Sequence, residues 1–181
     1  MKAIVIYKTK TGFTKQYAEW IAKELACEAV SADKISQLKL QNYRTIIYGG
    51  GVTAGQIGGL KKFKKRIAGN PGQKLIVFAT GAAPAEALKV KDVVKEANFT
   101  TEEIEKIPYF YFQSGINYEA MKLGSKLMMK MFVAMLGKKK DKTPEEEGMA
   151  KTIAKSIDYS DIKFIQPIVS YVKSMESHLQ K

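Results

Sequence analysis

The chain has 181 residues, of which 45% are hydrophobic, and a formal net charge of +12 at pH 7. This length and composition predict a single globular domain, residues 1–181, large enough to bury a full core. A single cysteine excludes an internal disulfide, and no cysteine–histidine cluster indicates a metal site. The absence of a signal-peptide pattern and of a run of about 18 apolar residues favours a cytoplasmic protein without a spanning helix. The net positive charge predicts an anionic partner: nucleic acid, acidic protein, anionic lipid or a carboxylated small molecule.

The first predicted element is a buried strand over residues 2–7, which runs into a polar segment, residues 8–14, and then into a helix. Hydroxyls and a glycine just before a helix place unpaired backbone N–H groups and the positive end of the helix dipole at one point. Threonine hydroxyls can add hydrogen bonds to phosphate oxygens. The segment therefore predicts an anion site, most often for a phosphate. Its candidate binding residues are Thr9, Lys10, Thr11, Gly12, Phe13 and Thr14.

Two common phosphate loops do not fit this segment. The dinucleotide-binding motif needs three spaced glycines, whereas only Gly12 is present, and the Gly-Lys-Ser/Thr ending of nucleotide triphosphate loops occurs nowhere in the chain. The pattern Thr9-x-Thr11-Gly12-x-Thr14 resembles the phosphate loop of flavodoxins, which wraps the terminal monophosphate of FMN. The resemblance implies FMN as the cofactor. The alternative is a hydroxyl-rich helix cap without a ligand.

Strands and helices alternate over the rest of the first 113 residues. Strands that are apolar along their whole length, separated by helices, are typical of a parallel sheet covered on both faces. Further strands are predicted at residues 27–30, 43–48, 74–79 and 106–113, and helices at 60–68, 85–97 and 102–106. Pro108 favours a sheet edge for the last of these strands. The fold class is therefore α/β and doubly wound. The flavodoxin resemblance implies a five-stranded parallel sheet in the order 2-1-3-4-5.

Loops rich in glycine, threonine and other small residues follow the first, third and fourth predicted strands. In a doubly wound sheet these carboxyl ends meet at one crevice, so the three loops are expected to share one ligand. Glycines let the backbone approach a flat ring closely. The resemblance implies that the second and third loops bracket the isoalloxazine ring of FMN, and the alternative for residues 49–59 is a flexible connector. The candidate ring-contact residues are Gly49, Gly50, Gly51, Val52, Thr53, Thr80, Gly81, Ala82 and Ala83.

Flavodoxins commonly place a Trp or a Tyr against the flavin in these loops. Residues 49–59 and 80–87 contain no aromatic residue, which implies an open ring face and favours a catalytic flavoprotein over an electron shuttle. The basic charge also departs from the acidic balance of small flavodoxin carriers. No side chain is predicted to act as a catalytic acid or base.

A helical insertion is predicted after the fifth strand, at about residues 116–158. Lysines 122, 126 and 130 form a stripe at i, i+4 and i+8, and Gly137 is expected to end the helix. Such a helix, predicted from residue 119 and followed by basic residues up to 142, makes residues 119–142 suit the surface of an anionic membrane. The alternatives are an adaptable pocket for a large apolar ligand, packing on the domain, or pairing with a second copy in a homodimer. The apolar positions of this helix are Leu127, Met128, Met131, Phe132, Met135 and Leu136.

Three other features of the chain are predicted to be structural. Residues 61–66 are expected to form the solvated face of a helix rather than a nucleic-acid site, since no recognition motif accompanies them. His178 and Cys27 are expected to have no catalytic role. A final helix is predicted over residues 161–178, capped by Ser160 or Asp161 and kinked at Pro167.

The aromatic strand 109–112, the segment 113–118 and the helix that follows resemble the flavodoxin-like menaquinone-dependent protoporphyrinogen dehydrogenases. These are small, basic, FMN-dependent proteins with an insertion at this place, associated with the cytoplasmic face of the membrane. The resemblance implies an FMN-dependent oxidoreductase that oxidises protoporphyrinogen IX, or a similar apolar carboxylated donor, with a quinone as acceptor. Two alternatives stay open: a flavodoxin-type electron carrier that docks on a redox protein, and a membrane-associated scaffold that has lost flavin.

Overall fold

The computed structural model describes residues 2–69, 72–84, 88–121, 123–138 and 156–179. Its centre is a parallel sheet in the strand order β2-β1-β3-β5-β6, to which β4 adds a short antiparallel strand beside β3. This confirms the predicted doubly wound α/β fold and its strand order, because β5 and β6 are the fourth and fifth predicted strands. The strands are β1 Ala3–Lys8, β2 Glu28–Ser31, β3 Thr45–Thr53, β4 Gln56–Ile57, β5 Lys74–Gly81 and β6 Tyr109–Gln113.

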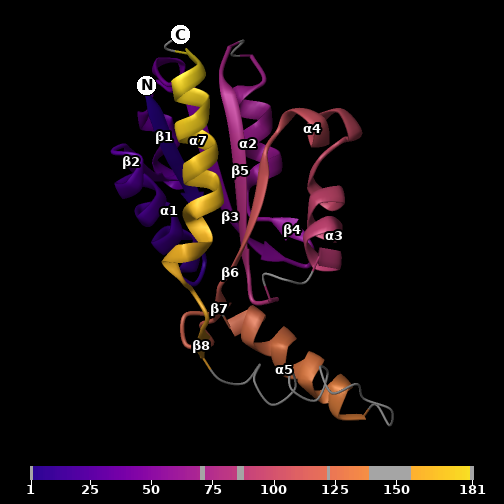
Figure 1. Cartoon of the computed structure of the whole chain (residues 1–181). Helices are drawn as coiled ribbons and strands as arrows, with labels where there is room; N and C mark the ends of the chain where they lie inside the picture. The colour runs from indigo at the N-terminus through magenta and orange to yellow at the C-terminus, as the bar shows by residue number, and fades with distance from the viewer. Residues whose placement is uncertain (1, 70–71, 85–87, 122, 139–155, 180–181) are drawn as a thin grey trace.

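Helices cover both faces of the sheet (Figure 1). The helices α1 (Phe13–Glu24) and α7 (Gln166–Leu179) pack on one face, where Tyr17, Ile21 and Ile168 are fully buried against the sheet. Leu60, Phe63 and Val94 fill the core of the other face, beneath α2 and α3. The helices and 3₁₀ helices on this second face are α2 Leu60–Ile67, α3 Leu88–Asn98, α4 Thr101–Lys106, η1 Ala32–Gln37 and η2 Leu40–Asn42.

Two predicted boundaries are wrong. The third strand does not end at Tyr48, because residues 49–51 keep pairing with β1 and β5 and the strand continues to Thr53. The final helix, predicted from residue 161, begins as α7 only at Gln166, and Pro167 lies in its first turn, where proline is well tolerated. A short η3 helix, Ile162–Ile165, precedes α7, and Asp161 caps it by accepting a hydrogen bond from the Lys163 amide at 2.9 Å.

The insertion begins and ends in a small antiparallel pair, β7 (Gly115–Ile116) with β8 (Ile157–Asp158). Between them, α5 (Leu123–Lys138) extends away from the end of the sheet at which β1 and β5 finish (Figure 1). The helix does not end at Gly137 as predicted but includes it. The basic residues predicted at 139–142, and Lys122, lie outside the described residues, as do the side chains of Phe132 and Leu136. Of the described helices, none combines the length and apolar character needed to cross a membrane.

Candidate functional site

The register of the sheet brings the three predicted loops to one edge. Lys8 pairs with Gly50, and Gly51 pairs with Thr80, so that the ends of β1, β3 and β5 lie side by side. The buried hydroxyls of Thr14 and Thr80 hydrogen-bond each other at 2.8 Å, although the two residues are 66 positions apart. This contact fixes the start of α1 against the end of β5. The structure therefore brings the first and third loops into direct contact, with Gly51 between them.

The loop before α1 has the backbone geometry of an anion cradle. Gly12 has a φ of +100°, a conformation that glycine adopts without strain, and its amide donates to Thr9 Oγ1 at 3.0 Å. The Gln16 amide makes the first bond of the helix, to the Gly12 carbonyl at 3.1 Å. The amides of residues 13–15 therefore have no acceptor within the helix. No side-chain oxygen accepts a hydrogen bond from the first amides of α1, as a capping side chain would.

The two lysines of this loop differ in their surroundings. Lys8, at the end of β1, forms an ion pair with Asp33 at the start of η1. The hydrogen bond from Lys8 is the main reason why the pKa of the Asp33 carboxyl lies below its ordinary value. Lys10 is exposed at the tip of the loop and forms no ion pair with any residue that the structure describes. Lys10 is thus available to an anion at the mouth of the loop.

The three glycines of β3 have different reasons for lacking a side chain. A Cβ at Gly49 would lie 2.0 Å from the Phe78 ring, and a Cβ at Gly50 would lie 2.6 Å from Ile57. These two glycines are therefore required by packing within the sheet, whatever else their backbone approaches. At Gly51 a Cβ would meet only the hydroxyls of Thr14 and Thr80, at 3.5 and 3.8 Å. Only Gly51 opens toward the hydroxyl pair.

The second loop is a tight hairpin rather than a long flexible connector. Ala54 (φ +49°) and Gly55 (φ +77°) form its turn, and Val52 pairs with Ile57 across it. Asn98, at the end of α3, holds the turn from outside: its Oδ1 accepts from the Ile57 amide at 2.8 Å, and its Nδ2 donates to the Gly55 carbonyl at 2.7 Å. The hairpin that carries Val52 and Thr53 is therefore fixed to the body of the domain.

The third loop continues from β5 under a tyrosine of the edge strand. Tyr111 donates to the Ala83 carbonyl at 3.3 Å, and its hydroxyl occupies the place that a side chain at Gly81 would need. Burial raises the pKa of the Tyr111 hydroxyl to about 12. Ala82 is exposed, and Ala83 is half-buried. The loop thus presents small side chains at the site, while Tyr111 supports it from behind.

The insertion reaches the loop before α1 through one residue that the sequence did not single out. Asn117 donates from Nδ2 to the Thr11 carbonyl at 3.1 Å, and its Oδ1 accepts from the Ala120 amide at 3.1 Å. Asn117 therefore couples the segment that leads into α5 with the loop that precedes α1. Neither Asn98 nor Asn117 has a sequence pattern of its own, because each acts through a contact more than 40 residues away along the chain.

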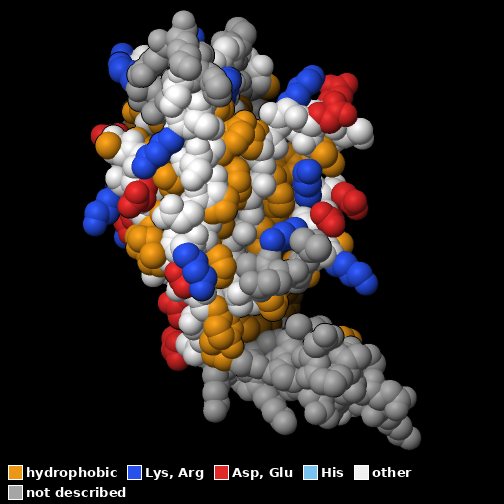
Figure 2. Space-filling model, viewed as in Figure 1, with side chains coloured by type: hydrophobic (Ala, Val, Ile, Leu, Met, Phe, Trp, Pro, Cys, Tyr) orange, Lys and Arg blue, Asp and Glu red, His pale blue; other side chains and the backbone are white. Residues whose placement is uncertain are grey.

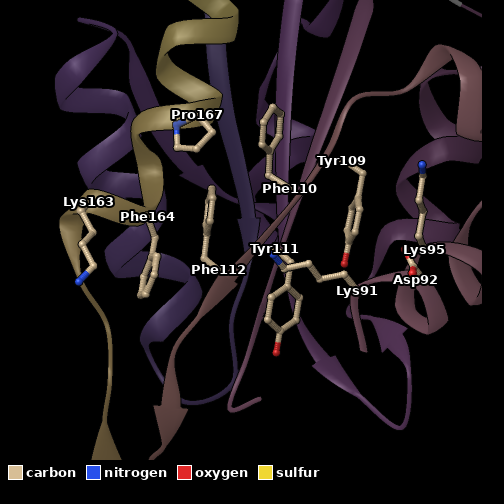
Figure 3. A pocket seen from close by; sticks show the side chains of 10 residues that line it. All are labelled: Lys91, Asp92, Lys95, Tyr109, Phe110, Tyr111, Phe112, Lys163, Phe164 and Pro167. Carbon is tan, nitrogen blue, oxygen red and sulfur yellow. The ribbon is translucent and has the colours of Figure 1, made fainter. Parts of the chain in front are cut away.

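A cavity of about 450 Å³ lies elsewhere, along the free edge of β6. Figure 3 shows Phe110, Phe112 and Phe164 on one side of this strand and Tyr109 and Tyr111 on the other. Figure 2 shows hydrophobic side chains gathered in the strip beside α7, where this edge is exposed. None of the predicted site residues lines this cavity. Among the described residues, no group of three potential metal ligands is found.

The chain belongs to the flavodoxin domain family, whose pattern matches residues 4–143. No curated protein sequence matches the chain significantly. The fold is similar to that of a flavodoxin, WrbA-like protein from Agrobacterium tumefaciens, with 16% identity, a TM-score of 0.47, and coverage of 67% of this chain and 85% of that one. It is also similar to a flavoprotein in complex with FMN from Lactobacillus acidophilus, with 17% identity, a TM-score of 0.44 and coverage of 62% and 91%.

A third similar structure is an FMN-dependent NADH-azoreductase from Bacillus anthracis in complex with FMN. It shares 10% identity, has a TM-score of 0.43, and is matched over 86% of this chain and all of that chain. Membership of the flavodoxin domain family supports FMN, the cofactor predicted from the sequence. The cradle before α1, the pair of threonine hydroxyls and the bare backbone at Gly51 fit a phosphate with a flat ring beside it.

Proposed function

We propose that the protein is an FMN-dependent oxidoreductase. The observation that carries the proposal is the Thr14–Thr80 hydroxyl pair, which lies below the uncapped start of α1 and faces Gly51, where no side chain intervenes. Amides with no helical acceptor and threonine hydroxyls are ligands for a phosphate that need no cationic side chain. FMN carries one such phosphate, and bound FMN supplies the electron-transfer chemistry itself.

The residues of the chain orient the cofactor in this proposal. Thr9, Thr11, Gly12, Phe13 and Thr14 hold the phosphate, with Lys10 at the mouth of the loop. The Gly50 and Gly51 backbone, with Val52 and Thr53, lies along one edge of the ring, and Thr80, Gly81, Ala82 and Ala83 lie along the other. Because Asn98 and Asn117 fix the hairpin and the phosphate loop, the site is preorganised and loses little conformational entropy on binding.

The proposed donor is protoporphyrinogen IX or a similar apolar carboxylated molecule, and the proposed acceptor is a quinone at the surface of an anionic membrane. Three observations support this part of the proposal. No aromatic residue lies in the hairpin or in the described part of the third loop, so one ring face is left open to a substrate. Five apolar side chains of α5 are exposed, those of Leu123, Leu127, Met128, Met131 and Met135, and α5 extends from the same end of the sheet as the candidate site.

The second candidate is an electron carrier whose net charge of +12, unlike that of acidic flavodoxin carriers, suits docking on an acidic redox protein. Purified, FMN-loaded protein distinguishes the two functions. An enzyme oxidises the porphyrinogen with a quinone over many turnovers, and its rate is proportional to the protein concentration. A protein that exchanges single electrons with ferredoxin-type acceptors, but gives no turnover with any quinone, is a carrier and contradicts the proposed enzyme.

A further inference from the structure

A second cavity, of about 580 Å³ and wide open to solvent, lies on the surface next to the proposed FMN site. Its wall is formed by the tip of the phosphate loop, the β3–β4 hairpin and α2. It therefore touches the proposed site at Lys10 and Thr53, while its remaining lining residues belong to no part of that site. The lysines that line it are Lys10, Lys61, Lys62 and Lys65.

These four lysines form a concentrated positive charge. No aspartate or glutamate lines the cavity, and none of the four makes an ion pair with a residue in the described part of the chain. Asp33 is close enough to Lys62 to be influenced by its charge, but Asp33 is already held by Lys8. Four ammonium groups that share one cavity without a counter-ion repel each other, and a multivalent anion relieves that repulsion.

The arrangement favours adjacent phosphates over a single one. Lys61 and Lys65 are four residues apart on α2 and therefore lie on the same face of the helix. Lysine binds phosphate oxygens as a point charge, and the exposed Thr53 hydroxyl can donate another hydrogen bond. The single phosphate of FMN is served by residues 9–14, Lys10 included, so it leaves the charges of Lys61, Lys62 and Lys65 unmatched.

We infer that this cavity binds the polyphosphate group of a second small molecule next to the flavin. The inference rests on the proposed function only in placing a bound flavin beside the cavity. The lysines and their cavity are present whether or not FMN is bound.

Calorimetric titration of the FMN-loaded protein with inorganic tripolyphosphate, at fixed ionic strength, tests the inference. The protein is expected to bind one tripolyphosphate per chain, and Lys61→Gln/Lys65→Gln is expected to weaken this binding at least tenfold. The matched control is Lys39→Gln/Lys173→Gln, which removes the same charge from two exposed positions outside the cavity and is expected to change the affinity less than twofold.

Three results would overturn the inference: no binding of tripolyphosphate, equal weakening in both double variants, or binding of citrate as tight as that of tripolyphosphate. The second result would mean that the net charge alone attracts the anion. The flavin absorbance of the same samples separates this test from that of the proposed function. Protein that takes up no FMN contradicts the proposed function, and its titration with tripolyphosphate still tests the cavity.

Discussion

The glycines and threonines of the candidate site differ in role because different atoms surround each of them. Glycine at positions 49 and 50 is required by Phe78 and Ile57, while the same residue at 51 leaves space beside two hydroxyls. The sequence Gly-Gly-Gly indicates that the backbone packs closely against other atoms. It does not identify those atoms, because they belong to elements far away in the sequence. The hydroxyl pair of Thr14 and Thr80 could be expected from the convergence of loops, but its direct contact could not.

The Tyr111 hydroxyl provides a prediction about pH. Its pKa is raised to about 12 in the folded protein by burial, whereas an unfolded tyrosine titrates at about 10. The unfolded chain therefore releases this proton first as the pH rises. The contribution of Tyr111 to stability is fully present below about pH 10 and is lost as the pH approaches 12. In Tyr111→Phe, the unfolding free energy is expected to fall less steeply over this range than in the wild type.

Urea unfolding measures this difference in the free energy of unfolding. It is carried out at a series of pH values between about 9 and 12, a range that spans the two pKa values. Tyr159→Phe is the matched control because this tyrosine is 50% exposed. Parallel pH profiles for Tyr111→Phe and the wild type would show that the raised pKa makes no contribution to folding.

The β3–β4 hairpin is the element whose position depends most clearly on a distant side chain. Asn98→Ala removes the acceptor of the Ile57 amide and the donor to the Gly55 carbonyl. Groups left unpaired in this way cost about 1–3 kcal/mol, so the unfolding free energy is expected to fall by that amount. Because the hairpin borders the proposed ring site, FMN affinity is also expected to fall. Each loss of about 1.4 kcal/mol in the free energy of FMN binding weakens the affinity about tenfold.

Chemical unfolding and FMN titration of the same variant measure these two effects. Asn42→Ala, at an exposed position at the end of η2, is the control for loss of an asparagine. Unchanged FMN affinity in a destabilised Asn98→Ala protein would show that the hairpin does not contribute to the ligand site.

The helix α5 was predicted with its apolar side chains along one arc, and the structure exposes several of them: Leu123 is 88% exposed, Leu127 60% and Met131 65%. Burying one Leu or Met side chain is worth about 1.5–3 kcal/mol. If α5 lies on an anionic membrane, Leu127→Gln/Met131→Gln is expected to reduce binding to phosphatidylserine vesicles at least tenfold, with FMN affinity unchanged.

Sedimentation with vesicles measures this binding. Val93→Gln/Ile162→Gln is the matched control, because it changes two exposed apolar residues on α3 and η3 that are 59% and 50% exposed. Equal vesicle binding by both double variants would remove α5 from the proposed membrane surface.

At the scale of the whole molecule, the sheet and its order could be predicted because buried parallel strands are apolar throughout and alternate with helices. The convergence of the first and third loops follows from the same topology and is confirmed by the Thr14–Thr80 contact. The two bracing asparagines could not be predicted, since an isolated asparagine has many local roles and only the fold supplies its partners. The boundary of β3 was missed for a related reason, because glycine is a poor strand former unless neighbouring strands need the space.

The account as a whole depends on the phosphate site, and titration of flavin-free protein with FMN, followed by quenching of flavin fluorescence, tests it most directly. One FMN per chain is expected to bind. Thr14→Val, which removes the hydroxyl that meets Thr80, is expected to weaken binding about 10- to 100-fold, the equivalent of about 1.4–2.8 kcal/mol. Thr14→Ser, which keeps the hydroxyl, and Thr101→Val, at an exposed position on α4, are expected to bind as the wild type does. No uptake of FMN by the folded wild-type protein, or equal affinity in Thr14→Val and the wild type, would contradict the account.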